Sequence, residues 1–372
     1  MKRYYIIYLL FIVLLLSCSK DDNEKIEIAE KTIIVYMAGD NNLYRNVESD
    51  IREMMECEIP ESCNLAVYVD APLWTDVETP QLFKIRSGEL ISVKRYDSHN
   101  SASKDVVRQV ISDAMNNFKA QTYDLILWSH GTGWLPSNIF ENLTKSFGKE
   151  DSSEIEITDL ANVLPDGFEC IIFDACLMGG IEVYYQLRNK ADIIIASPAE
   201  ILVMGFPYDK IIPLLFAVSP NYAKVADEYM SYYKNQAGAL QSATISVVAT
   251  KHLETLAGLL NDAVVSGKIG PVHDRDKIQK YDLLENSIFY DFMDCIGNTV
   301  NSENHIIEIG RQLSKVVIYN DFTPHFLGKF EIVSSCGISI YVSYNNQELD
   351  KAYRQLDWYI DSKCSIVASS LY

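Results

Sequence analysis

The feature that most constrains the fold of this chain is a series of short, almost wholly apolar runs that alternate with segments of helical periodicity. The runs are TIIVYMA (32–38), NLAVYVD (64–70), DLILWS (124–129), CIIFDA (170–175) and DIIIAS (192–197). A strand that is apolar on both faces has to be covered on both faces, and alternating strands and helices favour a parallel sheet. The sequence therefore predicts an α/β/α sandwich around a central, mostly parallel β-sheet.

Weaker patterns complete the chain. Apolar spacing predicts helices over about 43–56, 103–118, 177–187, 209–217, 221–235, 251–266, 283–296 and 303–319. A hairpin is expected over 82–86 and 90–96, and later strands over 242–250 and 337–343. Residues 136–157 read as a long polar loop. We expect a core over 31–250 and a C-terminal helical and β extension over 251–372 that completes or covers it.

The N-terminus has the pattern of an export signal. Lys2 and Arg3 precede a short apolar run that ends at Ser17-Cys18, which predicts a signal peptide over residues 1–17. The letters LLSC resemble the lipobox of bacterial lipoproteins, which implies lipid attachment to Cys18, a flexible tether over 18–30 and anchoring to the cell envelope. The alternative is an ordinary secreted protein in which Cys18 is incidental.

The charge balance restricts the partners. The chain has 51 acidic and 32 basic side chains and a formal net charge of −19. Nucleic-acid binding depends on basic patches, so we expect no nucleic-acid partner. The excess of acid is compatible with cationic substrates, and equally with a solvated acidic surface.

Two strand ends carry the residues of thiol chemistry. His130-Gly131 follows one buried run and Cys176 follows the next, and sites in α/β sheets lie at such carboxyl ends. A cysteine nucleophile needs a proton donor for the leaving group and donors for the oxyanion. We expect Cys176 at the start of a helix near Leu177, where the helix N-terminus favours the thiolate. The alternatives are a buried structural cysteine and a satisfied histidine.

Five segments resemble one family. VYMAGDNNL (35–43), LWSHGTGW (127–134), FDACLMG (173–179), ASPAEI (196–201) and GISIY (337–341) are similar to the clostripain family, in the clan of caspases, legumain and gingipains. The resemblance covers roughly 31–342. It implies a caspase-like fold and a cysteine endopeptidase, with His130 as general acid, Cys176 as nucleophile, and backbone N–H groups of Gly131 and Cys176 as the oxyanion hole.

The resemblance also implies a specificity pocket. Asp174 would select Arg or Lys in the substrate through a charge-assisted pair. Residues two apart in a strand face the same side, so Asp174 and Cys176 are expected to project to one site. An N-cap is the alternative for Asp174, and legumain-like cleavage after Asn is the alternative specificity. Asp40 and Ser197 also follow strands and are further candidates for substrate binding, although a turn role suits Asp40 as well.

Processing, metals and partners rest on the resemblance alone. Relatives are zymogens cut between the His and Cys strands, which makes Lys145 and Lys149 candidate self-cleavage sites. Several relatives need calcium, but the chain has no EF-hand loop and its other histidines fit no metal spacing. We expect a monomer that acts on peptides with basic residues. A lipoprotein that binds peptides without cleaving them is the alternative from another functional class.

Overall fold

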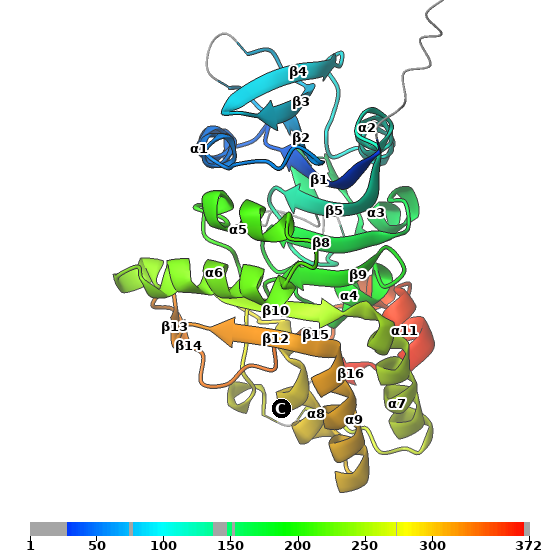
Figure 1. Ribbon diagram of the computed structural model, residues 1–372. Helices are drawn as coiled ribbons and strands as arrows, with labels where there is room; N and C mark the ends of the chain where they lie inside the picture. Colours follow the sequence, from blue (N-terminus) through cyan, green and yellow to red (C-terminus); the bar gives the residue numbers. More distant parts are fainter. Residues whose placement is uncertain (1–27, 74–76, 137–146, 151–152, 273, 368–372) are drawn as a thin grey trace, which may run out of the picture.

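The computed structural model describes residues 28–73, 77–136, 147–150, 153–272 and 274–367 (Figure 1). The predicted signal peptide, Cys18 and most of the tether lie outside the described residues, as do Lys145 and the side chain of Lys149.

A nine-stranded sheet forms the centre of the molecule. In spatial order its strands are β12 (Val317–Phe322), β10 (Thr244–Ala249), β9 (Ala191–Ala196), β8 (Phe168–Asp174), β5 (Ala120–Trp128), β1 (Ala29–Ala38), β2 (Cys63–Asp70), β3 (Gln81–Arg86) and β4 (Glu89–Arg95). Strands β9, β8, β5, β1 and β2 are parallel, and the two strands at each edge pair antiparallel. The parallel strands are those with wholly apolar runs, as predicted.

Helices cover both faces of the sheet (Figure 1). One face carries α1 (Tyr44–Met55), α5 (Tyr208–Leu215) and α6 (Tyr222–Lys234), whose buried side chains form one core with the sheet. The other carries α2 (Lys104–Asn117), α3 (Ile157–Val163), α4 (Ile181–Gln186), α7 (Leu253–Val265) and α9 (Glu303–Val316). Residues 31–38 of β1 are all buried, because each pleat of the strand meets one of these cores. The predicted α/β/α sandwich is confirmed.

The C-terminal region extends this sandwich and packs against it. Strand β12 pairs antiparallel with β10 and so extends the central sheet. A small sheet of β11 (Phe289–Asp291), β15 (Ser339–Ser343) and β16 (Ile366–Val367) packs beside α4, where Ser339 bridges Gly180. Helices α8 (Phe292–Thr299), α10 (Gln347–Tyr353) and α11 (Asp357–Ser362) surround it.

Three predicted helices differ from the structure. The one expected over 283–296 is replaced by β11 and α8. The one expected to end at 319 ends at Val316, because the β-branched run that follows forms β12. The one expected from Leu177 begins at Ile181, which changes the surroundings of Cys176. The polar loop also contains two short strands, β6 (Phe147–Glu150) and β7 (Ser153–Ile155).

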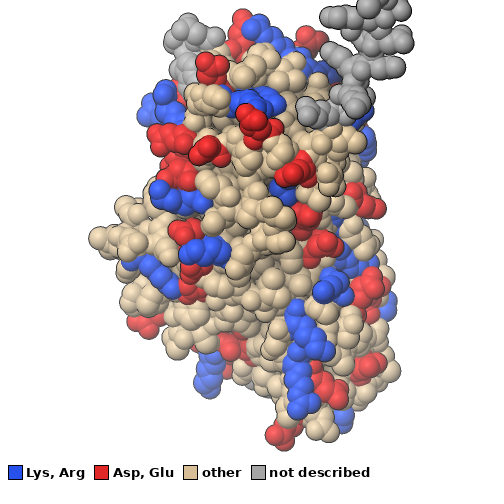
Figure 2. All heavy atoms as spheres, in the orientation of Figure 1, with Lys and Arg blue, Asp and Glu red and all other residues tan. Residues whose placement is uncertain are grey.

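On the surface, basic and acidic side chains are interspersed over the face shown in Figure 2. Within the part of the chain that the structure describes, no helix is both long enough and apolar enough to span a membrane.

Candidate active site

The register of the parallel strands brings the candidate residues to one sheet edge. Trp128 at the end of β5 is level with Asp174 at the end of β8 and with Met37 near the end of β1. The turns after these strands border a cavity of about 280 Å³. Its lining comprises Leu43, Trp128, Ser129, His130, Gly131, Thr132, Asp174, Ala175, Cys176, Leu177, Glu200, Ile201, Leu202, Val203 and Gly205. His130, Cys176 and Asp174, which are far apart in sequence, therefore share one cavity.

The turn that carries His130 is held from three sides. The Ser129 hydroxyl donates to the carbonyl of Ala38 at 2.7 Å, which joins the β5 turn to the β1 turn. The His130 carbonyl accepts from the backbone N–H of Gly148 at 3.1 Å. The ring atom Nε2 of His130 lies 2.7 Å from Oδ1 of Asn42. Only the last of these contacts acts on the imidazole itself.

The thiol of Cys176 is paired with the backbone of Ile201. The N–H of Ile201 donates to Sγ at 3.3 Å, and the thiol donates to the Ile201 carbonyl at 3.5 Å. Burial raises the pKa of Cys176 to about 12, the Ile201 N–H lowers it, and the charges of Glu200 and Asp174 raise it. In this state the group is therefore a thiol, and its activation requires loss of the proton to a base.

The expected helix N-terminus at Cys176 is wrong. Leu177 adopts a φ of 60°, and α4 begins only at Ile181, so residues 177–180 turn the chain before the helix forms. The N-terminus of α4 is therefore not at Cys176 and does not lower the pKa of its thiol. Apolar periodicity could not distinguish this turn from a first helical turn, because Leu177 and Met178 are both buried.

Glycine is required beside Cys176. A Cβ on Gly131 would lie 2.7 Å from the carbonyl oxygen of Cys176 and 3.0 Å from Cβ of Ala175. Such contacts are closer than real Cβ atoms tolerate, so only glycine lets the two turns approach. The two backbone segments predicted to form the oxyanion hole are thus in contact.

Asp174 lines the cavity as a buried carboxylate held by neutral donors. Its Oδ2 accepts from the Tyr208 hydroxyl at 2.9 Å and from the Phe206 N–H at 3.2 Å. Burial raises the pKa of Asp174 to about 6, and these two hydrogen bonds oppose the rise. A side chain at Gly205 would place its Cβ 2.6 Å from Oδ2, so glycine is needed there too. Asp174 does not cap α4, which begins only at Ile181.

Two further acids lie behind Asp174 on α1. Asp50 is buried and accepts from the Trp128 indole N–H at 2.7 Å, and burial and the charge of Asp174 raise its pKa to about 9. Glu53 accepts from the backbone N–H of Tyr208 at 2.9 Å. Among the described residues, neither Asp50 nor Asp174 has an ion pair with Lys or Arg. Within the described residues, the Asp174 carboxyl group in the cavity wall therefore has no ion pair with a basic side chain.

The other substrate-binding candidates do not line the cavity. Ser197 is fully buried, and its hydroxyl pairs with that of Thr244 at 2.7 Å. Asp40 is exposed in the turn after β1. Residue patterns indicated Glu200 as part of a possible pocket wall, but they did not single out Asn42 or the wall residues Ile201, Leu202 and Val203. A signal for both was present, since Asn42 belongs to the AGDNNL run and Glu200 and Ile201 belong to the ASPAEI run.

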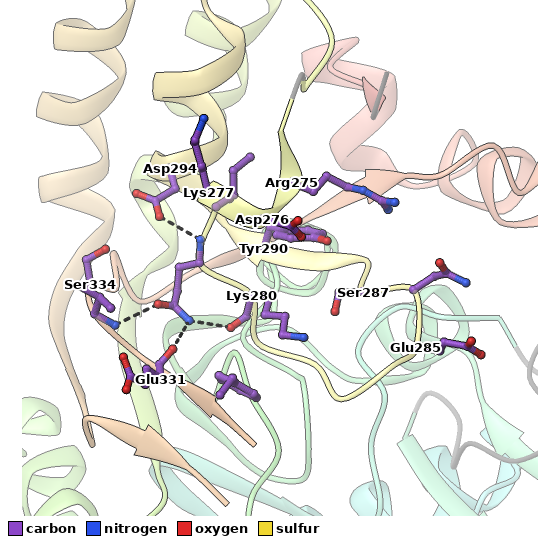
Figure 3. Close-up of a pocket in the computed structure, with 15 residues that line it drawn as sticks. Arg275, Asp276, Lys277, Lys280, Glu285, Ser287, Tyr290, Asp294, Glu331 and Ser334 are labelled. Carbon is purple, nitrogen blue, oxygen red and sulfur yellow. Dashed lines mark hydrogen bonds between the residues drawn. The ribbon is translucent and has the colours of Figure 1, made fainter. Parts of the chain in front are cut away.

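A larger cavity, of about 680 Å³, lies in the C-terminal region (Figure 3). The side chain of Gln279 links two segments of the cavity wall. Its amide nitrogen donates to the carbonyls of Lys280 and Glu331, and its amide oxygen accepts from the N–H of Val333. None of the described residues that line it is a cysteine or a histidine.

Metal and disulfide chemistry find no support in the described residues. No group of three or more His, Cys, Asp or Glu among them is placed to hold a metal ion. The seven described cysteines are free, including Cys57 and Cys63, which are close in sequence.

Comparisons with known proteins agree with this geometry. The model of the clostripain family, Peptidase_C11, matches residues 35–366. The solved structure of an inactive zymogen C11 protease from Parabacteroides distasonis superposes with a TM-score of 0.78 at 32% identity, covering 90% of this chain and 98% of that one. A secreted C11 cysteine protease from Bacteroides thetaiotaomicron, in complex with an irreversible peptide inhibitor, gives a TM-score of 0.79 at 29% identity, covering 90% and 99%.

The curated relative is longer. Clostripain from Hathewaya histolytica is 28% identical over 235 residues, which are 52% of this chain and 42% of that protein. This chain thus spans less than half the length of that relative. The family match, which extends from β1 to β16, includes every residue that lines the smaller cavity. The chain belongs to the clostripain family of cysteine peptidases.

Proposed function

We propose that the protein is a cysteine endopeptidase that hydrolyses peptide bonds after Arg or Lys. The observation that carries the proposal is the shared cavity of His130, Cys176 and Asp174. A nucleophile, an acid–base group and a charge-selecting group within one cavity are the parts that such a reaction needs.

The chemistry follows from the lining residues. His130 takes the proton of the Cys176 thiol, and the thiolate attacks the carbonyl carbon of the substrate. The developing oxyanion accepts hydrogen bonds from the N–H groups of Gly131 and Cys176. The C–N bond then breaks as the amine receives the proton from His130. Water attacks the thioester, and the carboxylic product leaves with the thiol restored.

The specificity follows from uncompensated charge. A guanidinium or ammonium group in the cavity would meet Asp174, whose present partners are a phenol and a backbone N–H. Arg matches a carboxylate by two parallel hydrogen bonds and is the preferred residue, while Lys binds as a point charge. An Asn side chain has no charge to offer, which disfavours cleavage after Asn.

A panel of otherwise identical peptides that end in Arg, Lys, Asn or Asp before a fluorescent reporter tests this. Wild type should prefer Arg, then Lys, and Cys176→Ala should abolish all cleavage. Asp174→Asn should lower kcat/KM for Arg by about 10–100-fold, the equivalent of one charged hydrogen bond, without a comparable loss on any uncharged substrate. Preference for Asn would transfer the protein to legumain-like specificity. Peptide capture without any turnover, and without reaction of Cys176 with a thiol reagent, would instead indicate a binding lipoprotein.

We further propose that the chain is made as a zymogen, cut after Lys145 or Lys149, and that it is anchored by lipid on Cys18 as a monomer at the bacterial cell envelope. Its relatives include an inactive zymogen and a secreted enzyme, which supports export and latency. The pairing of Cys176 with Ile201 is compatible with a latent thiol.

A further inference from the structure

The larger cavity, of about 680 Å³, has two basic side chains in its wall that the described chain does not neutralise (Figure 3). Arg275 and Lys280 are partly buried, and neither forms an ion pair with a described Asp or Glu. Nη1 of Arg275 is buried and has no hydrogen-bond partner among the described residues. A buried donor without an acceptor costs free energy, so the cavity favours a ligand that supplies an acceptor.

Tyr290 of β11 is a common neighbour of the two cations. Burial raises the pKa of the Tyr290 phenol to about 12 and the charge of Arg275 lowers it, so the guanidinium group lies near this ring. Lys280 is bridged directly to Tyr290 in an antiparallel pair, and residues opposite each other in such a pair project to the same face. In Figure 3 the side chains of Arg275 and Lys280 both extend to the right of the view. The two cations therefore border one side of the cavity.

The carboxylates of this cavity do not neutralise its two cations. Three of them, on Asp276, Glu285 and Glu331, are exposed, so water screens their charge. The fourth, on Asp294, is half-buried and accepts from the backbone N–H of Gln279 at 3.1 Å. The carboxylates of Asp294 and Glu331 lie on the left of the view in Figure 3, away from the two cations. The side of the cavity with the cations thus matches a carboxylate of a ligand.

The loop that follows Lys280 adjoins both cavities. Its residues 285–287 line the larger cavity. Burial raises the pKa of Glu200 and the charge of Asp282 raises it further, so Asp282 lies near this wall residue of the smaller cavity. Asp282 also accepts from the backbone N–H of Phe289 at 2.7 Å, which closes the loop.

An apolar contact joins the two cavities as well. Phe330, which lines the larger cavity, packs against a buried cluster that contains Ala199 and Tyr281. The carbonyl of Ala199 accepts at 2.9 Å from the N–H of Leu177, which lines the smaller cavity. A polypeptide bound in the smaller cavity can therefore continue over this loop to the larger one.

We propose that the larger cavity is an auxiliary substrate-binding site, in which Arg275 and Lys280 bind an acidic side chain of the protein substrate at a distance from the scissile bond. The inference rests on the proposed peptidase function. Arg275 can bind a carboxylate by two parallel hydrogen bonds, and Lys280 adds a point charge. The chain as a whole has a net charge of −19 and repels acidic peptides, so the selection of an acidic residue is a local property of this cavity.

A scan with glutamate tests the site. The substrates are peptides with one Arg, a background of Gly, Ser and Gln, and a single Glu placed at successive positions on either side of the Arg. With wild type, Glu at a defined position remote from the Arg should lower KM by about 10-fold relative to Gln, the size of a charged hydrogen bond. The value of kcat should stay within about twofold. Arg275→Gln and Lys280→Gln should each remove most of this gain.

Lys277→Gln is the matched control. Lys277 also lines the larger cavity, but it is exposed and its ammonium group lies 2.9 Å from the carboxylate of Asp274. Loss of the same charge at this position should leave the preference for Glu unchanged. Arg275→Lys, which retains the charge without the planar guanidinium group, should keep part of the gain. Cleavage of a short Arg reporter peptide, which does not reach the larger cavity, should be equal in all these variants.

Equal KM values for Glu and Gln at every position would overturn the inference, and so would a loss of the preference in Lys277→Gln as large as in Arg275→Gln. Thermal unfolding of each variant excludes loss of the fold as the cause of a change in KM.

A binding measurement separates this inference from the proposed function. If wild type cleaves no peptide, the proposed function fails, and the cavity is then tested by fluorescence anisotropy with Cys176→Ala protein and a labelled Glu-rich peptide that lacks Arg and Lys. Binding at low salt that Arg275→Gln weakens by about 10-fold, and Lys277→Gln does not, would support the acidic-residue site. Binding that is absent, or equal in both variants, would contradict it.

Discussion

At the scale of the residue, the notable groups around the cavity are acids whose charge has no counter-ion in the described chain. The Asp174 carboxyl group accepts from a phenol and a backbone N–H, and that of Asp50 behind it accepts from an indole N–H. Two buried carboxyl groups close enough to influence each other do not both ionise readily, so the outer one carries the charge and the inner one retains its proton.

Asp50 should accordingly reduce stability in alkaline solution. Its pKa of about 9 in the folded protein lies above its ordinary value, so the folded state retains a proton that the unfolded state loses. The contribution of this proton to the free energy of unfolding is fully present below about pH 4, and it is lost as the pH rises toward 9. The amide side chain of the Asp50→Asn variant does not titrate. The free energy of unfolding of this variant, relative to that of wild type, should therefore rise by at least about 1.4 kcal/mol from pH 5 to pH 8.5, the equivalent of one pKa unit. Urea unfolding at the two pH values measures this, and a difference that does not depend on pH would contradict it.

At the scale of the element, the opposite end of the sheet carries a buried ion pair. Lys31 on β1 lies 2.8 Å from Asp124 on β5 and 2.7 Å from Glu169 on β8, and the side chains of Lys31 and Asp124 are 7% and 0% exposed. Burial raises the pKa of Asp124 to about 6 in spite of the lysine. Lys31, Asp124 and Glu169 together join three adjacent strands at the end of the sheet away from the candidate active site.

Removing only the cation should therefore destabilise the sheet. Lys31→Met leaves Asp124 buried without its cation and should cost about 3–5 kcal/mol at pH 8. The loss should be smaller at pH 5, because Asp124 can then take up a proton. Lys31→Met/Asp124→Leu, which removes both charges, should be more stable than the single variant. A double variant as unstable as Lys31→Met in thermal unfolding would show that packing of the lysine stem, and not charge, is responsible.

At the scale of the whole molecule, the two proposed catalytic residues follow adjacent strands that are separated in sequence by the proposed cleavage segment. Strands β5 and β8 pair in parallel over Asp124–Trp128 and Cys170–Asp174. The pieces on either side of a cut after Lys145 or Lys149 would remain parts of one sheet, and the C-terminal piece would include β12, which extends that sheet.

After self-cleavage, the two fragments should thus stay associated in one folded molecule. Wild type should give two fragments on a denaturing gel and one peak of unchanged size in gel filtration. The Cys176→Ala variant should stay intact by itself but should be cut when wild-type protein is added. The Lys145→Ala/Lys149→Ala variant should stay intact in both cases. Separation of the fragments in native buffer, or cleavage of the double lysine variant at the same place, would contradict this account.

Local patterns were sufficient for much of this architecture. Apolar runs located all five parallel strands, because strands buried on both faces must be apolar throughout. Local patterns failed where neighbouring elements decide the local conformation. Val317–Phe322 forms a strand because it can pair with β10. Leu177 lies in a turn because the backbone at Cys176 packs closely against Gly131.

The sequence by itself determined that His130, Asp174 and Cys176 follow buried parallel strands, since hydrophobic periodicity and residue type are properties of the chain. Only the tertiary structure decided that Asn42 meets the imidazole, that Ile201 covers the thiol, that Asp50 lies behind Asp174, and that Ser197 and Asp40 stay outside the cavity. The reason is that strand order and register select which strand ends are neighbours, and neither is written in the spacing of residues along a single segment.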